Sequence, residues 1–308
     1  MSAMRALAGL VVKGPWQAGL VIVLATALAM AAPPLTSVLI YAGGGALALY
    51  TLYAGAAESL LTLAGSLAFV GGLLLAAGGQ AAPAGLLLLY WLPVWLSAVV
   101  LRYTVSLSAA LLALTAIGLL LVVLAFAWLG DPAAWWQQQL QPLVEQLARQ
   151  AELGLDRGEL QTAAARTARL MTGLMSAGLV FAALFSLLLG RWWQSLLVNP
   201  GGLGKEFLAL ALGRGPTLAA AALLGLASLD LGVAADFATQ LALVVLVPLV
   251  LVGLAAIHAS LVARGVGRGW LVGLYLVVGL LPQALLLVAV VGLLDPWLDL
   301  RRRSGARG

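Results

Sequence analysis

Long apolar runs, separated by short polar intervals, make up most of the chain. A helix needs roughly 20 apolar residues to cross the roughly 30 Å hydrocarbon layer of a bilayer, where every backbone polar group must be bonded within the spanning segment. The candidate spans are runs rich in Leu, Ala and Val. They cover residues 16–32, 35–53, 56–77, 85–101, 105–129, 170–189, 217–229, 237–262 and 270–294. The pattern therefore predicts an all-α, polytopic transmembrane helical bundle with eight to nine spans.

One extended polar interval, residues 130–169, separates the first five runs from the last four. Within it, Leu140, Val144, Leu147 and Ala151 follow one another at spacings of four, three and four, which is typical of one face of a helix. We expect one extramembrane amphipathic helix that lies on the outer membrane surface or covers a central cavity as a lid. The chain then divides into N-terminal transmembrane helices at 1–129, the amphipathic extramembrane segment at 130–169, and C-terminal transmembrane helices with a basic tail at 170–308.

Composition agrees with this pattern and excludes several classes of protein. Apolar residues make up 63% of the 308 residues and charged residues 9%, with a mean hydropathy of +1.09. Soluble domains contain about 45–50% apolar and about 25% charged residues. This composition therefore excludes a soluble enzyme and a disordered chain. The sequence contains no cysteine, which excludes disulfides and thiolate chemistry. Because it also contains a single histidine, we expect no metal site and no cofactor.

Basic residues indicate how the chain is oriented, because cytoplasmic loops of membrane proteins carry an excess of Arg and Lys. We expect a cytoplasmic N-terminus and an uncleaved first span. Nine spans would put the arginines at 301–303 outside and eight would put them inside, so the span count and the side of the C-terminus stay open. We assign the net charge of +5 to such loops rather than to nucleic-acid binding. The residues expected on the cytoplasmic side are Arg5, Lys13, Arg102, Arg191, Lys205, Arg214, Arg264 and Arg268.

Neither a Walker-type phosphate loop nor a His-Glu-x-x-His metal motif occurs in the sequence, and we expect that the protein is not an enzyme. A charge near the bilayer centre costs roughly 2.5–3.5 kcal/mol, so polar residues in or beside spans are candidates for ligand binding. The candidates are His258, Gln240, Gln283 and Asp236. The alternative is structural, with a neutral imidazole bonded to a backbone carbonyl at His258 and interhelical hydrogen bonds at both glutamines.

Glycine, proline and tryptophan positions predict local contacts. The glycines at 43–45 lie within an apolar run, and Gly265, Gly269 and Gly273 recur every four residues; both patterns favour close packing of helices. The two prolines at 33–34 predict a bend between the first two spans. Tryptophan suits the membrane–water interface because it has an apolar body and one polar N–H. We expect interface anchors at Trp135, Trp136, Trp192, Trp193 and Trp297.

Three blocks stand out from the apolar background. They are Gly-Arg-Trp-Trp-Gln at 190–194 with Asn-Pro-Gly-Gly at 199–202 and Glu-Phe at 206–207; Ile-His at 257–258 with Arg-Gly-Trp-Leu-Val at 268–272; and Leu-Leu-Asp-Pro-Trp-Leu-Asp-Leu-Arg-Arg-Arg at 293–303. Together these blocks resemble the YybS-like family of polytopic bacterial membrane proteins. That family has no established biochemical activity and is remotely similar to substrate-binding components of energy-coupling-factor transporters. The resemblance implies a location in the bacterial inner membrane and a helical bundle that holds a small molecule.

Two functions remain open. In the first, the protein binds or helps to transport a small apolar solute, because helices interrupted at Pro93, Pro248 and Pro282 expose backbone groups that can line a site. In the second, it is a structural or assembly subunit of a larger membrane protein complex. The charged tail at 295–308 would then dock another membrane protein. Expected partners are the lipid bilayer, a small-molecule ligand or another membrane protein, and not nucleic acid.

Overall fold

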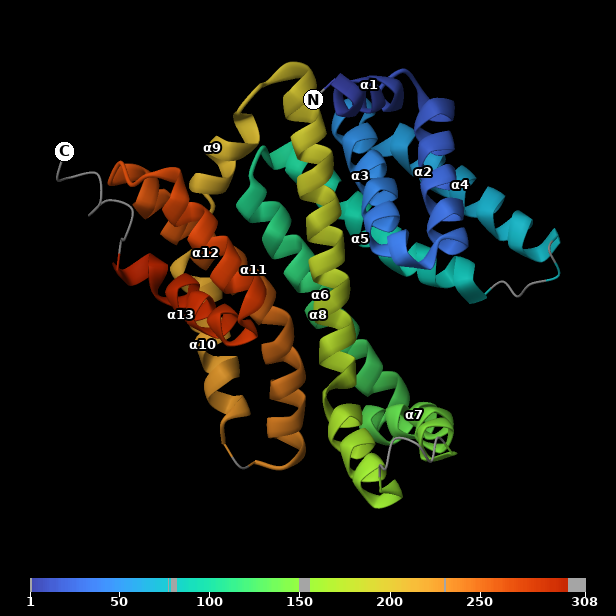
Figure 1. The fold of residues 1–308 in the computed structure, drawn as a ribbon, viewed down its shortest axis with the longest axis vertical. Helices are drawn as coiled ribbons and strands as arrows, with labels where there is room; N and C mark the ends of the chain where they lie inside the picture. The colour runs from blue at the N-terminus through green and yellow to red at the C-terminus, as the bar shows by residue number, and fades with distance from the viewer. Residues whose placement is uncertain (1, 77, 79–81, 150–155, 230, 299–308) are drawn as a thin grey trace.

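The computed structural model describes residues 2–76, 78, 82–149, 156–229 and 231–298 (Figure 1). All regular structure in these residues is helical, which confirms the all-α prediction. Ala151 and the arginines at 301–303 lie outside the described residues. The helices are α1 (Ser2–Val11), α2 (Pro15–Ala31), the 3-10 turn η1 (Pro33–Leu35), α3 (Thr36–Ala54), α4 (Ala56–Ala76), α5 (Ala82–Thr104), α6 (Leu107–Leu129), α7 (Pro132–Arg149), α8 (Arg157–Val198), α9 (Gly202–Leu208), α10 (Arg214–Ala227), α11 (Val233–Ala263), α12 (Arg268–Leu280) and α13 (Pro282–Leu298).

The long helix α8 is the centre of the bundle. Its 42 residues extend about 63 Å, and the carboxylate of Asp156 accepts hydrogen bonds from the backbone N–H groups of Gly158 and Glu159 at its start. Helices α3, α5, α6 and α11 pack directly on it. Figure 1 shows α2–α5 on one side of α8 and α10–α13 on the other. Helix α8 therefore joins the two halves of the molecule.

The apolar runs fold into six helices that are long and apolar enough to cross a membrane, or seven if α12 and α13 count as one bent span, in the part of the chain that the structure describes. This is fewer than the eight to nine spans expected. The run at 16–32 forms a helix of 17 residues and the run at 217–229 one of 14. The run at 270–294 breaks at Leu281, and α12 and α13 meet there at 116°. Pro282 begins α13, because proline cannot continue the preceding helix. The protein is a multi-pass membrane protein.

Basic residues gather at one end of the bundle. Gly44 lies against Ser186 and Gly190 against Ala48, so α3 and α8 run in parallel, and their C-terminal ends meet the loops that precede α2, α4 and α6 (Figure 1). We call this the basic end. The opposite end carries α7 and the first turns of α8 and α11. It also carries four arginines, Arg149 at the end of α7 and Arg157, Arg166 and Arg169 in the first part of α8, so among the described residues the two ends differ by seven basic residues to four. Which side of a membrane the basic end faces stays a prediction. The basic residues of the segments at this end are Arg5 in α1, Lys13 before α2, Arg102 at the end of α5, Arg191 in the last turns of α8, Lys205 in α9, Arg214 at the start of α10 and Arg264 directly after α11.

The polar interval at 130–169 forms α7 and the beginning of α8. Helix α7 folds back along α8, and the indole N–H of Trp136 donates a hydrogen bond of 2.9 Å to the hydroxyl of Thr172. Val144 is buried, as its place in the apolar stripe predicts. The boundary drawn at residue 169 falls inside α8, because that helix continues from the polar interval into the apolar run without a break.

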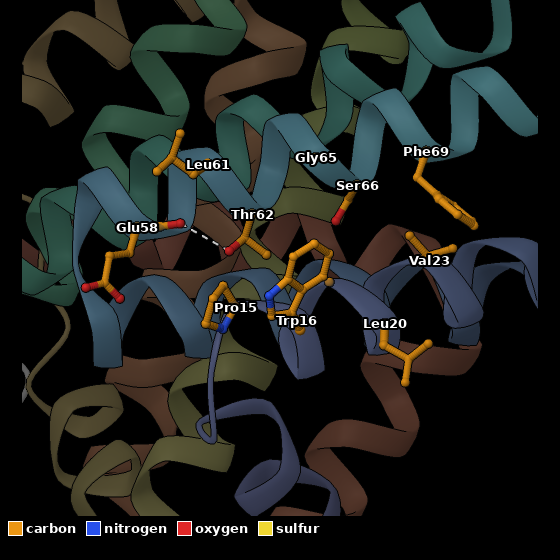
Figure 2. Close-up of a pocket in the computed structure, with 11 residues that line it drawn as sticks. Pro15, Trp16, Leu20, Val23, Glu58, Leu61, Thr62, Gly65, Ser66 and Phe69 are labelled. Carbon is orange, nitrogen blue, oxygen red and sulfur yellow. Dashed lines mark hydrogen bonds between the residues drawn. The ribbon is translucent and has the colours of Figure 1, made fainter.

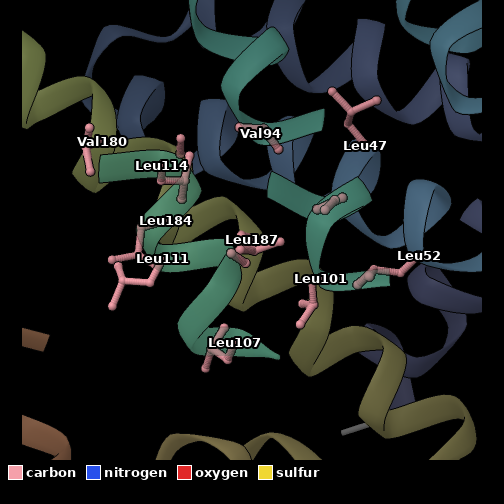
Figure 3. Close-up of a cluster of buried hydrophobic side chains, with 14 of the residues drawn as sticks. Leu47, Leu52, Val94, Leu101, Leu107, Leu111, Leu114, Val180, Leu184 and Leu187 are labelled. Carbon is pink, nitrogen blue, oxygen red and sulfur yellow. The ribbon is translucent and has the colours of Figure 1, made fainter. Parts of the chain in front are cut away.

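The closest helix contacts lie at glycines. A Cβ atom at Gly190 would be 2.7 Å from the carbonyl oxygen of Gly45, and one at Gly44 would be 2.7 Å from the hydroxyl of Ser186. Leucines and valines of α3, α5, α6 and α8 form the apolar core around this crossing (Figure 3). The packing role predicted for the glycines at 43–45 is therefore confirmed.

A second close crossing joins α11 to α13, where a Cβ atom at Gly253 or Gly292 would overlap the backbone of the other helix. The predicted stripe at Gly265, Gly269 and Gly273 does not pack in this way. No atom of another described segment lies within 4 Å of the Cβ position of any of the three. That prediction is wrong within this chain, because α12 contacts α11 and α13 through other residues, such as Tyr275.

Candidate functional site

Gln240 joins two helices instead of facing a cavity. Its side-chain amide donates to the backbone carbonyl of Arg169, and its carbonyl oxygen accepts from the backbone N–H of Gly173. The side chain is buried, and a Cβ atom at Gly173 would press against the backbone of Gln240 at 2.7–2.8 Å. The interhelical hydrogen bond is therefore the role that the structure gives to Gln240.

His258 lies 18 residues further along α11, or about 27 Å away. Its Nδ1 atom is 2.9 Å from the hydroxyl of Tyr275 on α12, and its ring meets Phe207 of α9 edge-on with 5.9 Å between ring centroids. The hydrogen-bond partner is thus a tyrosine hydroxyl and not the backbone carbonyl expected. His258 links three segments near the basic end.

The four predicted ligand residues do not form one site. Asp236 is exposed in the first turn of α11, and Gln283 is exposed at the start of α13. Asp236 and His258 are 22 residues apart on one helix, or about 33 Å. No molecule of ordinary cofactor size would contact both ends of that helix.

The predicted interface anchors divide into exposed and buried residues. Trp135, Trp192 and Trp297 are each more than a third exposed, as expected of anchors, whereas Trp136 is partly buried by its contact with α8. Trp193 is only 2% exposed, so its assignment as an anchor is wrong. Successive residues on a helix point about 100° apart, and this turns the second tryptophan of the pair into the core.

Arg191 and Glu206 bind α9 to the end of α8. Nε of Arg191 donates to Oε2 of Glu206 at 3.0 Å and Nη2 donates to Oε1, in a two-pronged ion pair. The arginine is only 7% exposed. Gly202 closes the turn between the helices, because a Cβ atom there would lie 2.5 Å from the Asn199 amide nitrogen. Four residues of the first block, Arg191, Asn199, Gly202 and Glu206, therefore take part in one structural contact between α8 and α9.

A groove between α2 and α4 is the candidate site that sequence reasoning missed. It has a volume of about 500 Å³ and runs along the two helices from their first turns (Figure 2). Its wall residues recur every three or four positions on each helix, so each helix contributes one face. The residues from α2 are Pro15, Trp16, Gly19, Leu20 and Val23, and those from α4 are Glu58, Leu61, Thr62, Gly65, Ser66 and Phe69.

The groove exists because small residues line its floor. No atom lies within 4 Å of the Cβ position at Gly65, and a Cβ at Gly19 would make only ordinary contacts, the nearest 3.5 Å from the hydroxyl of Ser66. Trp16 lies beside Thr62 and Ser66 and is 87% exposed, and Phe69 lies at the end of the groove away from Glu58 and is 61% exposed (Figure 2). The cavity is thus open along its side to the lipid that would surround the bundle.

Three polar side chains lie along this apolar groove. The exposed carboxylate of Glu58 lies at the end nearest the first turn of α4 and receives a hydrogen bond of 3.4 Å from the hydroxyl of Tyr50. Thr62 is satisfied, because its hydroxyl donates to the backbone carbonyl of Glu58 at 3.1 Å (Figure 2). Ser66 is only 4% exposed, and its hydroxyl has no hydrogen-bond partner among the described residues. The wall of the groove therefore holds one exposed carboxylate and one hydroxyl that is buried and unbonded among the described residues.

A second groove of about 500 Å³ lies between α8 and α9, with Trp192 and Phe207 among its walls. Its one hydroxyl, that of Ser195, already donates to the backbone carbonyl of Trp192 at 2.7 Å. Its other polar side chain is the uncharged indole of Trp192, whereas the α2–α4 groove has a carboxylate and a hydroxyl that is buried and unbonded among the described residues, so the α2–α4 groove is the better candidate site. Within the described ranges, no group of three or more His, Asp or Glu side chains is placed to hold a metal ion.

The fold and the groove define the class as an all-α, multi-pass membrane protein with an apolar cavity open at the side of the bundle. The chain matches no family model, no curated protein and no solved structure. Its resemblance to the YybS-like family therefore stays a prediction from the three residue blocks.

Proposed function

We propose that the protein is a non-catalytic protein of the bacterial inner membrane that binds a small, largely apolar solute in the α2–α4 groove. We assign the basic end and the N-terminus to the cytoplasm. The observation that supports solute binding is the hydroxyl of Ser66, which is buried in the groove wall without a partner. A buried hydroxyl without a hydrogen bond costs about 1–3 kcal/mol, and a ligand with a suitable polar atom would recover that free energy.

Polar contacts matter more in this groove than they would in a water-filled pocket. Lipid tails are as apolar as leucine, so an apolar solute gains little from leaving the bilayer for an apolar wall. Selectivity must therefore come from shape and from hydrogen bonds. Gly19 and Gly65 provide the shape, and Glu58 and Ser66 provide the polar groups.

Native mass spectrometry of protein extracted gently from its own membrane tests this proposal. We expect a discrete small-molecule adduct on the unaltered protein and its loss in Gly65→Leu, whose side chain would fill the groove. Gly72→Leu is the matched control, because Gly72 lies on the same helix, has equally open surroundings and does not line the groove. An unaltered protein without an adduct, or an adduct that survives Gly65→Leu, would overturn the proposal.

The second candidate function, an assembly subunit of a larger complex, is favoured by α12. Trp270 and Leu280 are exposed on this helix, and no atom of another described segment lies within 4 Å of the Cβ position at Gly269 or Gly273. Such a helix suits close packing against another transmembrane helix. If it does so, Gly273→Leu abolishes co-purification of a second polypeptide. Unchanged co-purification would count against α12 as the docking element.

A further inference from the structure

We infer that the occupant of the α2–α4 groove is a single-chain amphiphile from the leaflet at the basic end, with a cationic ammonium head held by Glu58. This inference rests on the proposed function and adds the class of ligand. It commits to a lipid-like molecule in place of a soluble metabolite or a helix of another protein.

The length and position of the groove select this shape of ligand. Glu58 and Phe69 are 11 residues apart on α4, so the groove extends about 16 Å. That distance is about half of the roughly 30 Å hydrocarbon layer, which is the depth of one leaflet. Pro15 and Glu58 lie in the first turns of α2 and α4, so the groove begins at the basic end and runs towards the bilayer centre. One extended hydrocarbon chain with its head at the interface matches this geometry.

The charge of the groove selects the head group. Glu58 is the one charged side chain among the described residues that line it. It lies in the first turn of α4, where the positive end of the helix dipole favours a carboxylate. Although Glu58 lies at the basic end, it forms no ion pair within the described chain. A cationic head would provide the missing counter-charge.

The nearest basic groups along the chain are otherwise engaged or lie outside the groove. The guanidinium of Arg102 donates to the carbonyl oxygens of Leu52 and Tyr53, the latter at 2.9 Å, and so caps the end of α3. Arg191 is paired with Glu206. Lys13 is exposed just before α2 and does not line the groove. The carboxylate of Glu58 is therefore available to bind a cationic ligand.

The test compares three amphiphiles with the same chain and different heads. Dodecylamine, dodecanol and dodecanoic acid, each with a photoreactive group at the chain end, are added to the full-length protein in phosphatidylcholine nanodiscs. The labelled residues are then mapped by mass spectrometry. We expect the amine to label α2 and α4 about fivefold more than the acid, as a weak exposed ion pair would give. Glu58→Gln should remove this preference and Glu58→Asp should retain it.

Glu159→Gln is the control for loss of a carboxylate elsewhere, because Glu159 is exposed in the first turn of α8 at the opposite end of the bundle. It should leave the preference unchanged. Equal groove labelling by all three heads, or a preference for the acid, would overturn the inference while the groove remained a binding site. If no head labels the groove, or labelling is the same in Gly65→Leu, the proposed function itself fails.

Discussion

The α3–α8 crossing and the α2–α4 pair use the same residue types and reach opposite results. At the crossing, Gly44 and Gly190 let two backbones meet, and Ser186 shares a hydrogen bond of 2.5 Å with the hydroxyl of Tyr90. In the α2–α4 pair, the surroundings of Gly65 are open and the hydroxyl of Ser66 is unbonded within the described residues. A glycine or serine in a spanning helix thus allows either a tight contact or an empty space.

The difference follows from how many neighbours each helix has. Helix α8 is enclosed by α3, α5, α6 and α11, and half of its most apolar stretch is buried. Helix α4 lies at the edge of the bundle, where only 28% of the corresponding stretch is buried. A helix packed from several sides leaves no void unfilled, because tight packing is favourable in the interior. Helix α4 packs on α2, α3 and α5, but no atom of another described segment lies near the position of a Cβ at Gly65, so the space that this glycine leaves stays open.

The largest expected effect on stability comes from adding a leucine side chain at a glycine of the α3–α8 crossing, compared with adding one at a glycine of the α2–α4 groove. Gly190→Leu should destabilise the protein by at least about 3 kcal/mol, because the added side chain meets the backbone of α3 and cannot be accommodated by a rotamer change. Gly65→Leu should change the stability by less than about 0.5 kcal/mol. Unfolding of both variants by sodium dodecyl sulfate, followed by circular dichroism, measures this difference. If Gly190→Leu fails to fold, Gly190→Ala should show the same direction with a smaller loss, and equal stability of all variants would contradict the comparison.

The next largest effect on stability comes from removing the charge of Glu206, compared with removing that of Glu58, the other acidic residue at the basic end. Glu206→Gln should cost about 2 kcal/mol, because the nearly buried guanidinium of Arg191 loses its counter-charge. Glu58→Gln should cost less than about 0.5 kcal/mol, since this exposed carboxylate has no ion pair in the described structure. Thermal unfolding in mild detergent ranks the variants. Removing both charges with Arg191→Met and Glu206→Leu should cost less than Glu206→Gln alone, and a larger loss would show that packing rather than charge matters there.

Much of the fold could be predicted from the sequence, because the bilayer imposes length and composition on each span. The prolines at 33–34 do form a bend, η1, and the glycines at 43–45 do pack closely. Of the three helix interruptions predicted from proline, the one at Pro282 is confirmed by the break at Leu281. The interruptions predicted at Pro93 and Pro248 are wrong, because both prolines lie inside the continuous helices α5 and α11 and proline is tolerated in many transmembrane helices. Whether a glycine faces a neighbouring helix or lipid depends on tertiary arrangement, so the stripe at Gly269 and Gly273 was misassigned.

The candidate site was harder to predict than the fold. Rare polar residues within apolar runs were the predicted ligand residues. Two of them, His258 and Gln240, instead form hydrogen bonds with Tyr275 of α12 and with the backbone of α8. The groove is lined by common residues. Gly65 has no side chain to fill it, and the hydroxyl of Ser66 has no hydrogen-bond partner among the described residues. Glu58 and Ser66 are eight residues apart on α4, near one face of the helix, and that spacing with Gly65 beside it was the available signal.

A smaller effect is expected where a hydroxyl is bonded. Ser186→Ala should destabilise the protein by about 1 kcal/mol, because Tyr90 loses its closest hydrogen-bond partner in the core and retains only a contact of 3.4 Å to the carbonyl of Ile40. The midpoint of unfolding by sodium dodecyl sulfate reports the change. A variant as stable as the unaltered protein would show that the Ser186–Tyr90 hydrogen bond contributes nothing to the crossing.

The smallest effect on stability, and the one that distinguishes the groove most sharply, is expected at Ser66. Ser66→Ala should leave the protein as stable as before or stabilise it by up to about 1 kcal/mol, since an unbonded buried hydroxyl is removed. Ser59→Ala is the control: Ser59 lies two turns earlier on α4, and its hydroxyl accepts a hydrogen bond of 2.9 Å from the indole of Trp95. That variant should be destabilised by about 1 kcal/mol. Native mass spectrometry of Ser66→Ala should show loss of the ligand adduct without loss of stability. The reason is that the hydroxyl of Ser66, which is unfavourable in the empty groove, is the group that a ligand would bind. Loss of stability on a par with Ser59→Ala would show that Ser66 is bonded within the bundle and would remove it from the site.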